Sequence, residues 1–296
     1  MKEELKKIKG LKVLTDIDLS EYTTYKIATK GKYLCIPETM EAFIQVLAYI
    51  QKQQLPYLVL GGGSNVIFKN PVYEGIIIKL SEFDHVEING THIEVEAGYS
   101  TQKLALKVAR LGLTGMEFAA GVPGTIGGAI YNNSGCYHSD MGYIVKRARI
   151  LTPEFQIITM ENRELEFHYR TSFLKQHRGY ICLSAEIELE YGKKEEILEL
   201  MQDRKERRIR DQPLEFPSAG SVFRNPPNMY AGKLIEDSGL KGYAVGKAKV
   251  SEKHANFIVT EQKVLGKDII ELIQKIKGRI KENYGIDLIL EQEIIE

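Results

Sequence analysis

The sequence predicts a fold of mixed helices and strands, either α+β or α/β, and three stretches in the first half carry this prediction. Apolar residues recur at helical spacing over residues 38–54, and a short apolar run over 56–60 follows after a polar link. The run 75–80 (GIIIKL) is continuously apolar and has the length of a strand buried on both faces. Residues 91–98 (THIEVEAG) alternate as a half-buried strand does, and a helical pattern follows over 100–112.

Capping residues support the helix expected over residues 100–112 (STQKLALKVARLG). Ser100 or Thr101 stands at the N-cap, because either side-chain oxygen can accept a hydrogen bond from a free backbone N–H group of the first turn. Gly112 stands at the C-cap, where glycine readily adopts the left-handed conformation that ends a helix. The sequence therefore predicts both ends of this helix.

The second half of the chain continues the mixed pattern. In order, it predicts a half-buried strand over 180–190, a helix over 193–210, a loop-rich segment over 211–253, a strand over 255–260, an amphipathic helix that ends at Gly285, and a last strand over 286–296. We place the main domain boundary near residue 200, where the helix becomes a run of charged residues. The chain contains no internal repeat.

Composition excludes several classes of function. The 296 residues are 43% hydrophobic, enough for about two domains with buried cores. Forty basic residues balance forty acidic ones, which argues against a nucleic-acid partner. The start of the chain lacks the apolar core of a signal peptide, and no apolar run is long enough to cross a bilayer, so we expect a cytoplasmic protein. Cys35, Cys136 and Cys182 fit no disulfide framework or CxxC pair, so we expect reduced, structural thiols and no metal site.

Two glycine-rich loops are the strongest functional signal from the residues themselves. Residues 61–65 (GGGSN) follow a predicted strand, and residues 121–137 (GVPGTIGGAIYNNSGCY) are too apolar for a linker. Glycine lets a ligand approach the main chain, and successive backbone N–H groups form an anion-binding nest that suits phosphate. Neither G-x-G-x-x-G nor the P-loop motif is present, so neither a Rossmann site nor a P-loop is indicated. Tight turns between strands remain the alternative.

Seven motifs then point to one family. In chain order they are YTTYKI, LGGGSNVIF, GMEFAAGVPGTIGGAIYNNSG, FHYRTSFLK, PSAGSVFRNP, AGKLIEDSGLKGYAVGKAKVSEKHANFIV and LEQEI. Together they resemble the UDP-N-acetylenolpyruvoylglucosamine reductase family, the UDP-N-acetylmuramate dehydrogenases of peptidoglycan precursor synthesis. The motifs run from about residue 22 to residue 293, nearly the whole chain. The chain is similar in length to the short subtype, which lacks an extra insertion over the substrate.

The resemblance implies an α+β fold. We expect a two-lobed FAD-binding domain of the PCMH or vanillyl-alcohol-oxidase type over residues 1–75 and 76–200. A C-terminal α+β substrate-binding domain would follow over 201–296, with its last strand free to return to the FAD domain. The implied reaction passes hydride from NADPH to flavin and then to the enolpyruvyl group of UDP-N-acetylglucosamine enolpyruvate. The sequence itself does not rank NADPH over NADH, and it leaves the oligomeric state open, a monomer included.

The resemblance also places the cofactor on the two glycine loops. The implied FAD-binding residues are Tyr25, Gly61, Gly62, Gly63, Ser64, Asn65, Gly121, Pro123, Gly124, Thr125, Gly127 and Gly128. Some relatives in the wider fold attach flavin covalently through histidine or cysteine. Neither loop has a histidine, and Cys136 lies outside the glycine core of the second loop, so we expect non-covalent FAD.

Three residues match the catalytic positions of the family. Arg170 in HYRTSF would stabilise negative charge at the substrate carboxylate, and Ser221 in SAGSVF would donate a proton. Glu293 in LEQEI would orient the substrate, although alternation along the strand does not decide between Glu293 and Glu291. From the residues alone, a surface ion-pair partner, a turn serine and a solvent-facing glutamate are the alternatives.

Three further residues match substrate-binding positions, namely Asn225, Lys233 and His254. The basic cluster 204–210 is a weaker candidate for the UDP phosphates, because a solvated helix face explains it as well. The chain departs from the family where Gln292 replaces a common proline and where Ala28-Thr29 replaces two glycines.

Two rival functions stay open at this level. Another oxidoreductase of the same flavin fold would act on a different small substrate, and Arg170, Ser221 and the acidic terminus together argue against it. A nucleotide-binding module without catalysis would tolerate the loss of Ser221. The reductase hypothesis instead predicts that losing Ser221 slows reoxidation of the flavin by substrate.

Overall fold

The structure of the protein is a computed structural model that describes residues 1–261 and 263–296. Its internal contacts divide the chain into two compact units. Unit 1 comprises residues 1–14, 33–62 and 75–206, and unit 2 comprises residues 15–32, 63–74 and 207–296. Each unit therefore combines segments that are far apart in the sequence. The three-part division expected from the resemblance stays a prediction, although the expected main boundary lies close to Arg207, where the last segment of unit 2 begins.

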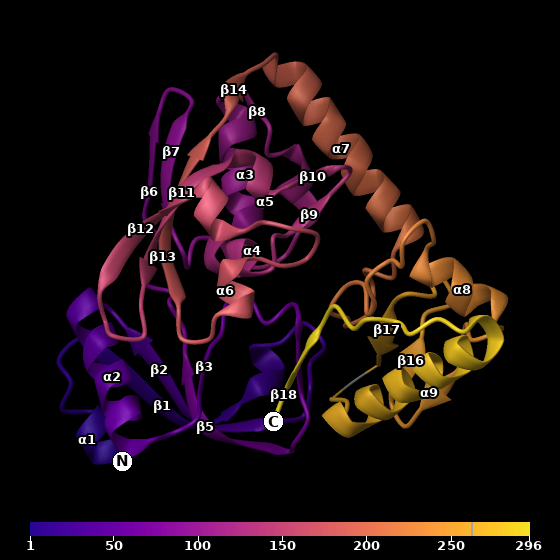
Figure 1. Cartoon of the computed structure of the whole chain (residues 1–296), viewed down its shortest axis with the longest axis horizontal. Coiled ribbons are helices and arrows are strands. Elements are labelled where there is room, and N and C mark those ends of the chain that lie inside the picture. Colours follow the sequence, from indigo (N-terminus) through magenta and orange to yellow (C-terminus); the bar gives the residue numbers. More distant parts are fainter. Residues whose placement is uncertain (262) are drawn as a thin grey trace. The chain divides into compact units, whose positions relative to one another are not determined.

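Unit 1 is built on a five-stranded antiparallel sheet with the order β12-β11-β13-β7-β6 (Figure 1). The strands are β6 (Val86–Asn89), β7 (His92–Glu96), β11 (Val145–Leu151), β12 (Ile157–Glu161) and β13 (Ile181–Glu188). The alternation expected over 180–190 is confirmed, because the side chains at 181, 183, 185, 187 and 189 are all buried. The strand over 91–98 is confirmed as β7.

Two helices and a 3-10 turn bring the second glycine loop to this sheet. They are α3 (Thr101–Arg110), η2 (Glu117–Gly121) and α4 (Ile126–Tyr131), and α4 packs against β13 and β7. Ser100 rather than Thr101 is the N-cap of α3, because its Oγ accepts a hydrogen bond from the Lys103 backbone N–H at 3.4 Å. Gly112 has φ +76°, as expected of a residue that ends a helix.

A four-stranded sheet with the order β1-β2-β5-β3 contains β3, the strand that precedes the first glycine loop. These strands are β1 (Leu11–Asp18), β2 (Lys30–Pro37), β3 (Tyr57–Val59) and β5 (Val72–Ile78), and β3 and β5 are parallel. Helix α2 (Met40–Gln53) is confirmed and begins after Thr39, whose Oγ1 accepts from the Ala42 N–H at 3.2 Å. The glycine loop thus leaves β3 as expected.

Unit 2 contains a three-stranded antiparallel sheet and two helices. The sheet has the order β15-β16-β17, with β15 (Ala244–Val245), β16 (Ala248–Val250) and β17 (Ile258–Thr260). Helices α8 (Ala231–Asp237) and α9 (Gly266–Tyr284) contact each other, and α9 packs on β15 and β16 (Figure 1). The expected apolar face of α9 is buried, and Gly285 ends the helix at φ +69°.

The last strand is shorter than predicted. Only β18 (Glu293–Ile295) is a strand within the expected range 286–296, and it pairs in parallel with β4 (Val66–Phe68). The preceding residues instead pair with the segment around Phe223, which forms an isolated bridge to Leu290. The chain end therefore connects the first glycine loop, which precedes β4, to the segment that contains Ser221.

The remaining elements are short, apart from α7 (Lys194–Asp211), which confirms the helix expected over 193–210. They are α1 (Lys2–Leu5), η1 (Leu19–Glu21), β8 (Leu113–Thr114), β9 (Gly135–Cys136), β10 (Ser139–Asp140), α5 (Met141–Ile144), η3 (Asn162–Leu165), α6 (Phe173–Gln176) and β14 (Glu190–Tyr191). Within the described residues, no helix is both long enough and apolar enough to cross a membrane.

The three cysteines are free thiols, as predicted. Cys35 and Cys182 are buried, and burial raises the pKa of each thiol to about 12. Cys136 is half-buried, and its thiol donates to the Phe118 carbonyl at 3.1 Å. All three therefore pack as small apolar residues.

Candidate active site

The two glycine loops contact each other within unit 1. A Cβ added to Gly61 would lie 2.7 Å from Thr125 Oγ1, and one added to Gly62 would lie 2.6 Å from Gly124 Cα. Both distances are too short for a side chain, so the close approach of the second loop already requires glycine at these positions. Gly124 itself has φ +125°, a conformation that L side chains rarely adopt.

Position 63 requires glycine for a different reason. It lies in unit 2 with φ +64°, and a Cβ there would lie 1.9 Å from the Tyr22 carbonyl oxygen. Its own carbonyl accepts a hydrogen bond from the Thr24 N–H at 3.1 Å. Asn65 Nδ2 donates to the Glu291 carbonyl at 3.3 Å, so the end of this loop contacts the C-terminal segment. Through Gly63 and Asn65, the loop contacts both the YTTYKI motif and the chain end.

The second loop is fixed at its centre by a helix cap. Gly121 ends η2, and Pro123 and Gly124 lead to Thr125, the N-cap of α4, whose Oγ1 accepts from the Gly128 N–H at 3.4 Å. Gly127 lies in the first turn of α4, and its N–H donates to the Ala97 carbonyl at 2.9 Å. The expected cofactor residues of this loop therefore form one compact turn.

The residues around both loops fit an anionic, hydrogen-bonding group such as the FAD diphosphate. Three buried hydroxyls have no hydrogen-bond partner within the described part of the chain, those of Ser20, Thr24 and Thr101. Thr24 lies beside Gly63, and Thr101 lies at the start of α3. The Thr101 N–H donates to the Gly124 carbonyl, which places this residue at the second loop. Lys79 Nζ donates to the Gly61 carbonyl at 2.7 Å, and burial lowers the pKa of this lysine.

Arg170 lies in a tight turn within unit 1. His168 and Thr171 exchange two backbone hydrogen bonds of 3.1 Å, which places Tyr169 and Arg170 at the tip. Arg170 is half-buried with φ +58°, a left-handed conformation that costs an ordinary residue free energy. Its guanidinium carbon lies 5.2 Å from the centre of the Tyr169 ring.

Side chains of the second glycine motif fix the position of this turn. Asn133 Nδ2 donates to the His168 carbonyl at 2.9 Å, and Asn133 is only 2% exposed. Ser172 Oγ donates to the Tyr131 carbonyl at 2.9 Å, and Lys175 Nζ donates to Asn132 Oδ1 at 2.7 Å. The YNNSG and HYRTSFLK motifs are therefore in direct contact, which nothing in their sequence spacing indicated.

Ser221 and Glu293 lie in unit 2 on neighbouring backbone segments. The Glu291 N–H donates to the Val222 carbonyl at 2.9 Å, and the Glu293 N–H donates to the Asn65 carbonyl at 2.9 Å. Glu291 and Glu293 are both half-buried, and one carboxylate oxygen of Glu293 is shielded from solvent. Arg170 belongs to unit 1.

Tyr25 and Gln292 are buried together in unit 2. Tyr25 is fully buried, and its hydroxyl donates to Gln292 Oε1 at 3.0 Å. Burial strongly raises the pKa of the Tyr25 phenol, so it is neutral at physiological pH. Its expected place beside the flavin stays a prediction, and the described contact of its hydroxyl is with Gln292.

The three expected substrate residues each have a contact inside the protein. Asn225 Oδ1 accepts from the Ala231 N–H at 3.0 Å at the start of α8. Lys233 Nζ contacts Asp237 Oδ1 at 2.5 Å on the exposed side of that helix. The Lys233–Asp237 contact raises the pKa of the lysine. Their substrate roles stay predictions.

His254 is half-buried and has a defined tautomer when neutral. Its Nδ1 accepts from the Asn256 N–H at 3.2 Å, so the ring proton lies on Nε2. The ring lies 4.8 Å from that of Phe257, centre to centre. Burial lowers the pKa of His254, so the ring is neutral rather than cationic at neutral pH.

His254 should make unit 2 less stable in mild acid. Since its folded pKa lies below the ordinary value of 6.5, the unfolded chain binds a proton that the folded chain does not. The free energy of unfolding should therefore be unaffected by His254 well above pH 6.5 and should decrease as the pH falls below it. Thermal denaturation of the wild type and His254→Asn between pH 7.5 and 5 checks this. An equal loss of stability in both proteins would contradict it.

Comparison with known proteins identifies the family. Residues 32–161 match a family described as an FAD binding domain, and residues 212–295 match the C-terminal domain of UDP-N-acetylenolpyruvoylglucosamine reductase. The reductase of Bacillus subtilis is 42% identical over 294 residues, 99% of this chain and 97% of that one. The one from Anoxybacillus flavithermus is 41% identical over 296 residues, 100% of this chain and 98% of that one. The chain belongs to the UDP-N-acetylenolpyruvoylglucosamine reductase family.

A solved structure supports the same conclusion. The crystal structure of UDP-N-acetylenolpyruvylglucosamine reductase from Thermus caldophilus is 32% identical and superimposes with a TM-score of 0.82, covering 97% of this chain and 99% of that one. The expected α+β flavoprotein fold, the FAD cofactor and the reductase activity in peptidoglycan precursor synthesis are therefore confirmed. The short length expected from the resemblance is confirmed as well.

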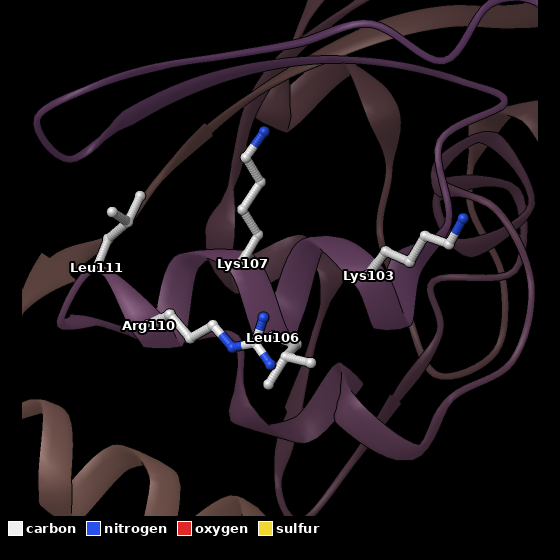
Figure 2. A pocket seen from close by; sticks show the side chains of 5 residues that line it. All are labelled: Lys103, Leu106, Lys107, Arg110 and Leu111. Carbon is white, nitrogen blue, oxygen red and sulfur yellow. The ribbon is translucent and has the colours of Figure 1, made fainter.

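Two other surface features do not belong to this reductase site. Figure 2 shows a shallow hollow on α3 lined by Lys103, Leu106, Lys107, Arg110 and Leu111. Four of these residues lie on the outward side of α3, opposite the buried face formed by Leu104 and Val108, and Leu111 follows the end of the helix. They include no acid, nucleophile or histidine, so this hollow offers no groups for the reductase chemistry.

The other feature is a polar cluster on the five-stranded sheet. Ligand atoms of His92, Glu94 and Glu186 lie within 4.8 Å of one another, a spacing that a metal ion could bridge. Arg147 Nε contacts Glu186 Oε1 at 2.7 Å, and His92 Nδ1 lies 3.6 Å from Glu188 Oε2. Ion pairs on an exposed sheet face explain this cluster. The expected absence of a metal stays a prediction.

Sequence reasoning missed three residues that shape the reductase site. Asn133 contacts the turn that contains Arg170, Lys79 contacts the first glycine loop, and Gln292 contacts Tyr25. A charged lysine at the end of an apolar run is unusual, and for Lys79 this was the signal in the sequence that could have indicated a specific contact. Gln292 was noticed only as a departure from the family pattern.

Proposed function

We propose that Arg170, Ser221 and Glu293 are the catalytic residues with which this chain reduces the enolpyruvyl group of UDP-N-acetylglucosamine enolpyruvate to give UDP-N-acetylmuramate. Residues of the two glycine loops hold FAD non-covalently through backbone N–H groups, with the hydroxyls of Thr24 and Thr101 as additional hydrogen-bonding groups. Held by these residues, FAD would supply hydride transfer from NADPH to the vinyl carbon of the substrate.

Arg170 binds the substrate carboxylate. Negative charge develops toward that carboxylate as the vinyl carbon gains hydride, and a guanidinium can donate two parallel hydrogen bonds to it. The turn from His168 to Thr171 fixes the backbone of Arg170 before substrate arrives. This preorganisation means that little reorganisation is needed as the charge forms.

Ser221 completes the reaction by donating its hydroxyl proton to the carbon next to the carboxylate. The serine oxygen then regains a proton from solvent or from a neighbouring group. Glu293 orients the substrate from the start of β18. Asn225, Lys233 and His254 contact the UDP-sugar, with His254 acting as a neutral hydrogen-bond donor through Nε2.

One observation carries this proposal. Backbone hydrogen bonds join three segments of unit 2. Glu291 in the C-terminal segment bonds to Val222, the residue after Ser221, and Glu293 bonds to Asn65 at the end of the first glycine loop. A proton donor, an acidic group and a cofactor loop are therefore fixed relative to one another within one unit. That arrangement suits a reaction in which hydride and proton reach adjacent carbons.

An anaerobic titration tests the proposed reaction. The purified protein should show a flavin absorption band that bleaches with NADPH and returns when UDP-N-acetylglucosamine enolpyruvate is added. NADH at the same concentration should bleach the band more slowly. UDP-N-acetylglucosamine, which lacks the enolpyruvyl group, is the matched control and should leave the flavin reduced. A reduced flavin that the enolpyruvyl substrate does not reoxidise would contradict the proposal.

A further inference from the structure

Buried polar contacts around Ser221 point to one residue outside the expected catalytic set. Gln292 is only 3% exposed, and both ends of its side-chain amide are hydrogen-bonded. Its Oε1 accepts from the Tyr25 hydroxyl at 3.0 Å. Its Nε2 donates to the Ala219 carbonyl at 3.1 Å and lies 3.4 Å from the carbonyls of Gly220 and Ser221. One amide thus contacts three consecutive carbonyls of the turn that contains Ser221.

The chemistry of these partners fixes the orientation of the amide. Backbone carbonyls only accept hydrogen bonds, so the side of Gln292 that faces residues 219–221 must be the NH₂ group. The opposite oxygen then requires a donor, which the Tyr25 hydroxyl supplies. Thr260 holds Tyr25 in turn, because its Oγ1 donates to the Tyr25 carbonyl at 3.0 Å. The network is fully satisfied and buried, which favours a single geometry.

Backbone hydrogen bonds hold the flanks of the turn, from the Thr260 N–H to the Pro217 carbonyl at 3.0 Å and from the Val222 N–H to the Asn256 carbonyl at 2.9 Å, but space is open at its centre. Gly220 has φ +73°, and a Cβ added there would have no neighbour within 4 Å. A glycine in open space has more backbone freedom than any other residue. The hydrogen bonds from Gln292 therefore add a restraint at the centre of this turn, and they come from the residue next to Glu293.

We propose that Gln292 is a positioning residue that fixes the Ser221 turn for proton transfer, with Tyr25 acting through Gln292. This inference rests on the proposed role of Ser221. Proton transfer to carbon depends steeply on the position of the donor. Reduction of the flavin by NADPH does not use Ser221. The network should therefore affect reoxidation of the flavin by substrate and leave its reduction by NADPH unchanged.

Stopped-flow kinetics of the two half-reactions test the inference in the FAD-loaded enzyme. In Gln292→Leu, reduction by NADPH should stay within about twofold of wild type, and reoxidation by substrate should slow at least about tenfold. Gln292→Glu should behave like Gln292→Leu, because its carboxylate can accept from Tyr25 but cannot donate to the carbonyls. Tyr25→Phe should slow reoxidation less, and the double variant Tyr25→Phe/Gln292→Leu should be no slower than Gln292→Leu.

Controls separate positioning from a general loss of stability. Ile276→Ala removes a buried side chain on α9 in the same unit and should leave both half-reactions unchanged. Backbone hydrogen exchange over residues 219–223 should accelerate in Gln292→Leu and not in Ile276→Ala. Unchanged exchange over 219–223, unchanged reoxidation, or an equal slowing of both half-reactions in Gln292→Leu would overturn the inference. A Ser221→Ala enzyme that reoxidises normally would instead overturn the proposed role of Ser221, while the exchange result would still report on Gln292.

Discussion

Ser221→Ala should leave reduction of the flavin by NADPH unchanged and slow its reoxidation by the enolpyruvyl substrate about 10³-fold, the usual size of a general-acid contribution. The substitution removes the hydroxyl that would protonate the carbon next to the carboxylate. It should not disturb the turn, because the contacts that the structure describes for Ser221 use its backbone carbonyl and its bridge to Phe257. Anaerobic stopped-flow absorbance resolves the two half-reactions.

Ser218→Ala is the matched control for this experiment. Ser218 lies three residues earlier in the same motif and is half-buried, as Ser221 is. Its loss should change neither half-reaction. Normal reoxidation in Ser221→Ala would remove the proton-donor role and would indicate that another acid donates the proton. Equal slowing of both half-reactions would indicate instead that the turn itself had been disturbed.

Arg170→Ala should slow reoxidation about 10²- to 10³-fold, the usual cost of removing one group that stabilises transition-state charge. FAD content and reduction by NADPH should be retained, since Arg170 is expected to meet the substrate carboxylate. Arg170→Lys should recover only part of the loss, because an ammonium keeps the charge but not the paired hydrogen bonds of the guanidinium. Flavin absorbance measures both content and rates.

Arg178→Ala is the control for charge. Arg178 is an exposed arginine eight positions further along the chain, so its loss changes the net charge equally and should leave reoxidation unchanged. If Arg170→Ala and Arg178→Ala slowed the reaction equally, a general electrostatic attraction of the anionic substrate would explain the effect. Raising the salt concentration would then reduce the wild-type rate by a similar factor.

The glycines of the first loop have two physical causes. The sequence suggested that a ligand excludes side chains from residues 61–63. The structure shows that protein atoms already exclude them, through the approach of Thr125, Gly124 and the Tyr22 carbonyl. The two causes are compatible, because loops that pack main chain to main chain also leave backbone N–H groups close enough to bind one anion.

Local patterns predicted the four longest helices of the described residues, α2, α3, α7 and α9, and several of the strands. Helix α9 and strand β13 follow from apolar periodicity, since each buries one face and the periods of 3.6 and 2 residues differ clearly. The chain end was harder. Residues 286–296 read as one strand, but only Glu293–Ile295 form one, because the earlier residues pair with the segment around Phe223. Which partner a strand finds depends on tertiary contacts that local pattern does not contain.

The sequence by itself determined the longest helices and the family motifs, because periodicity and motifs are local properties of the chain, and the resemblance carried by those motifs supplied the candidate residues Arg170, Ser221 and Glu293. It did not indicate α8, β15 and β16, which lie in the segment 211–253 that was expected to be rich in loops. Only the tertiary structure decided which segments meet. Asn133 contacts a turn 35 residues away, and Tyr25 contacts Gln292 across 267 residues. Such pairs arise when buried polar groups must find hydrogen-bond partners as distant segments pack, and no local pattern specifies that choice.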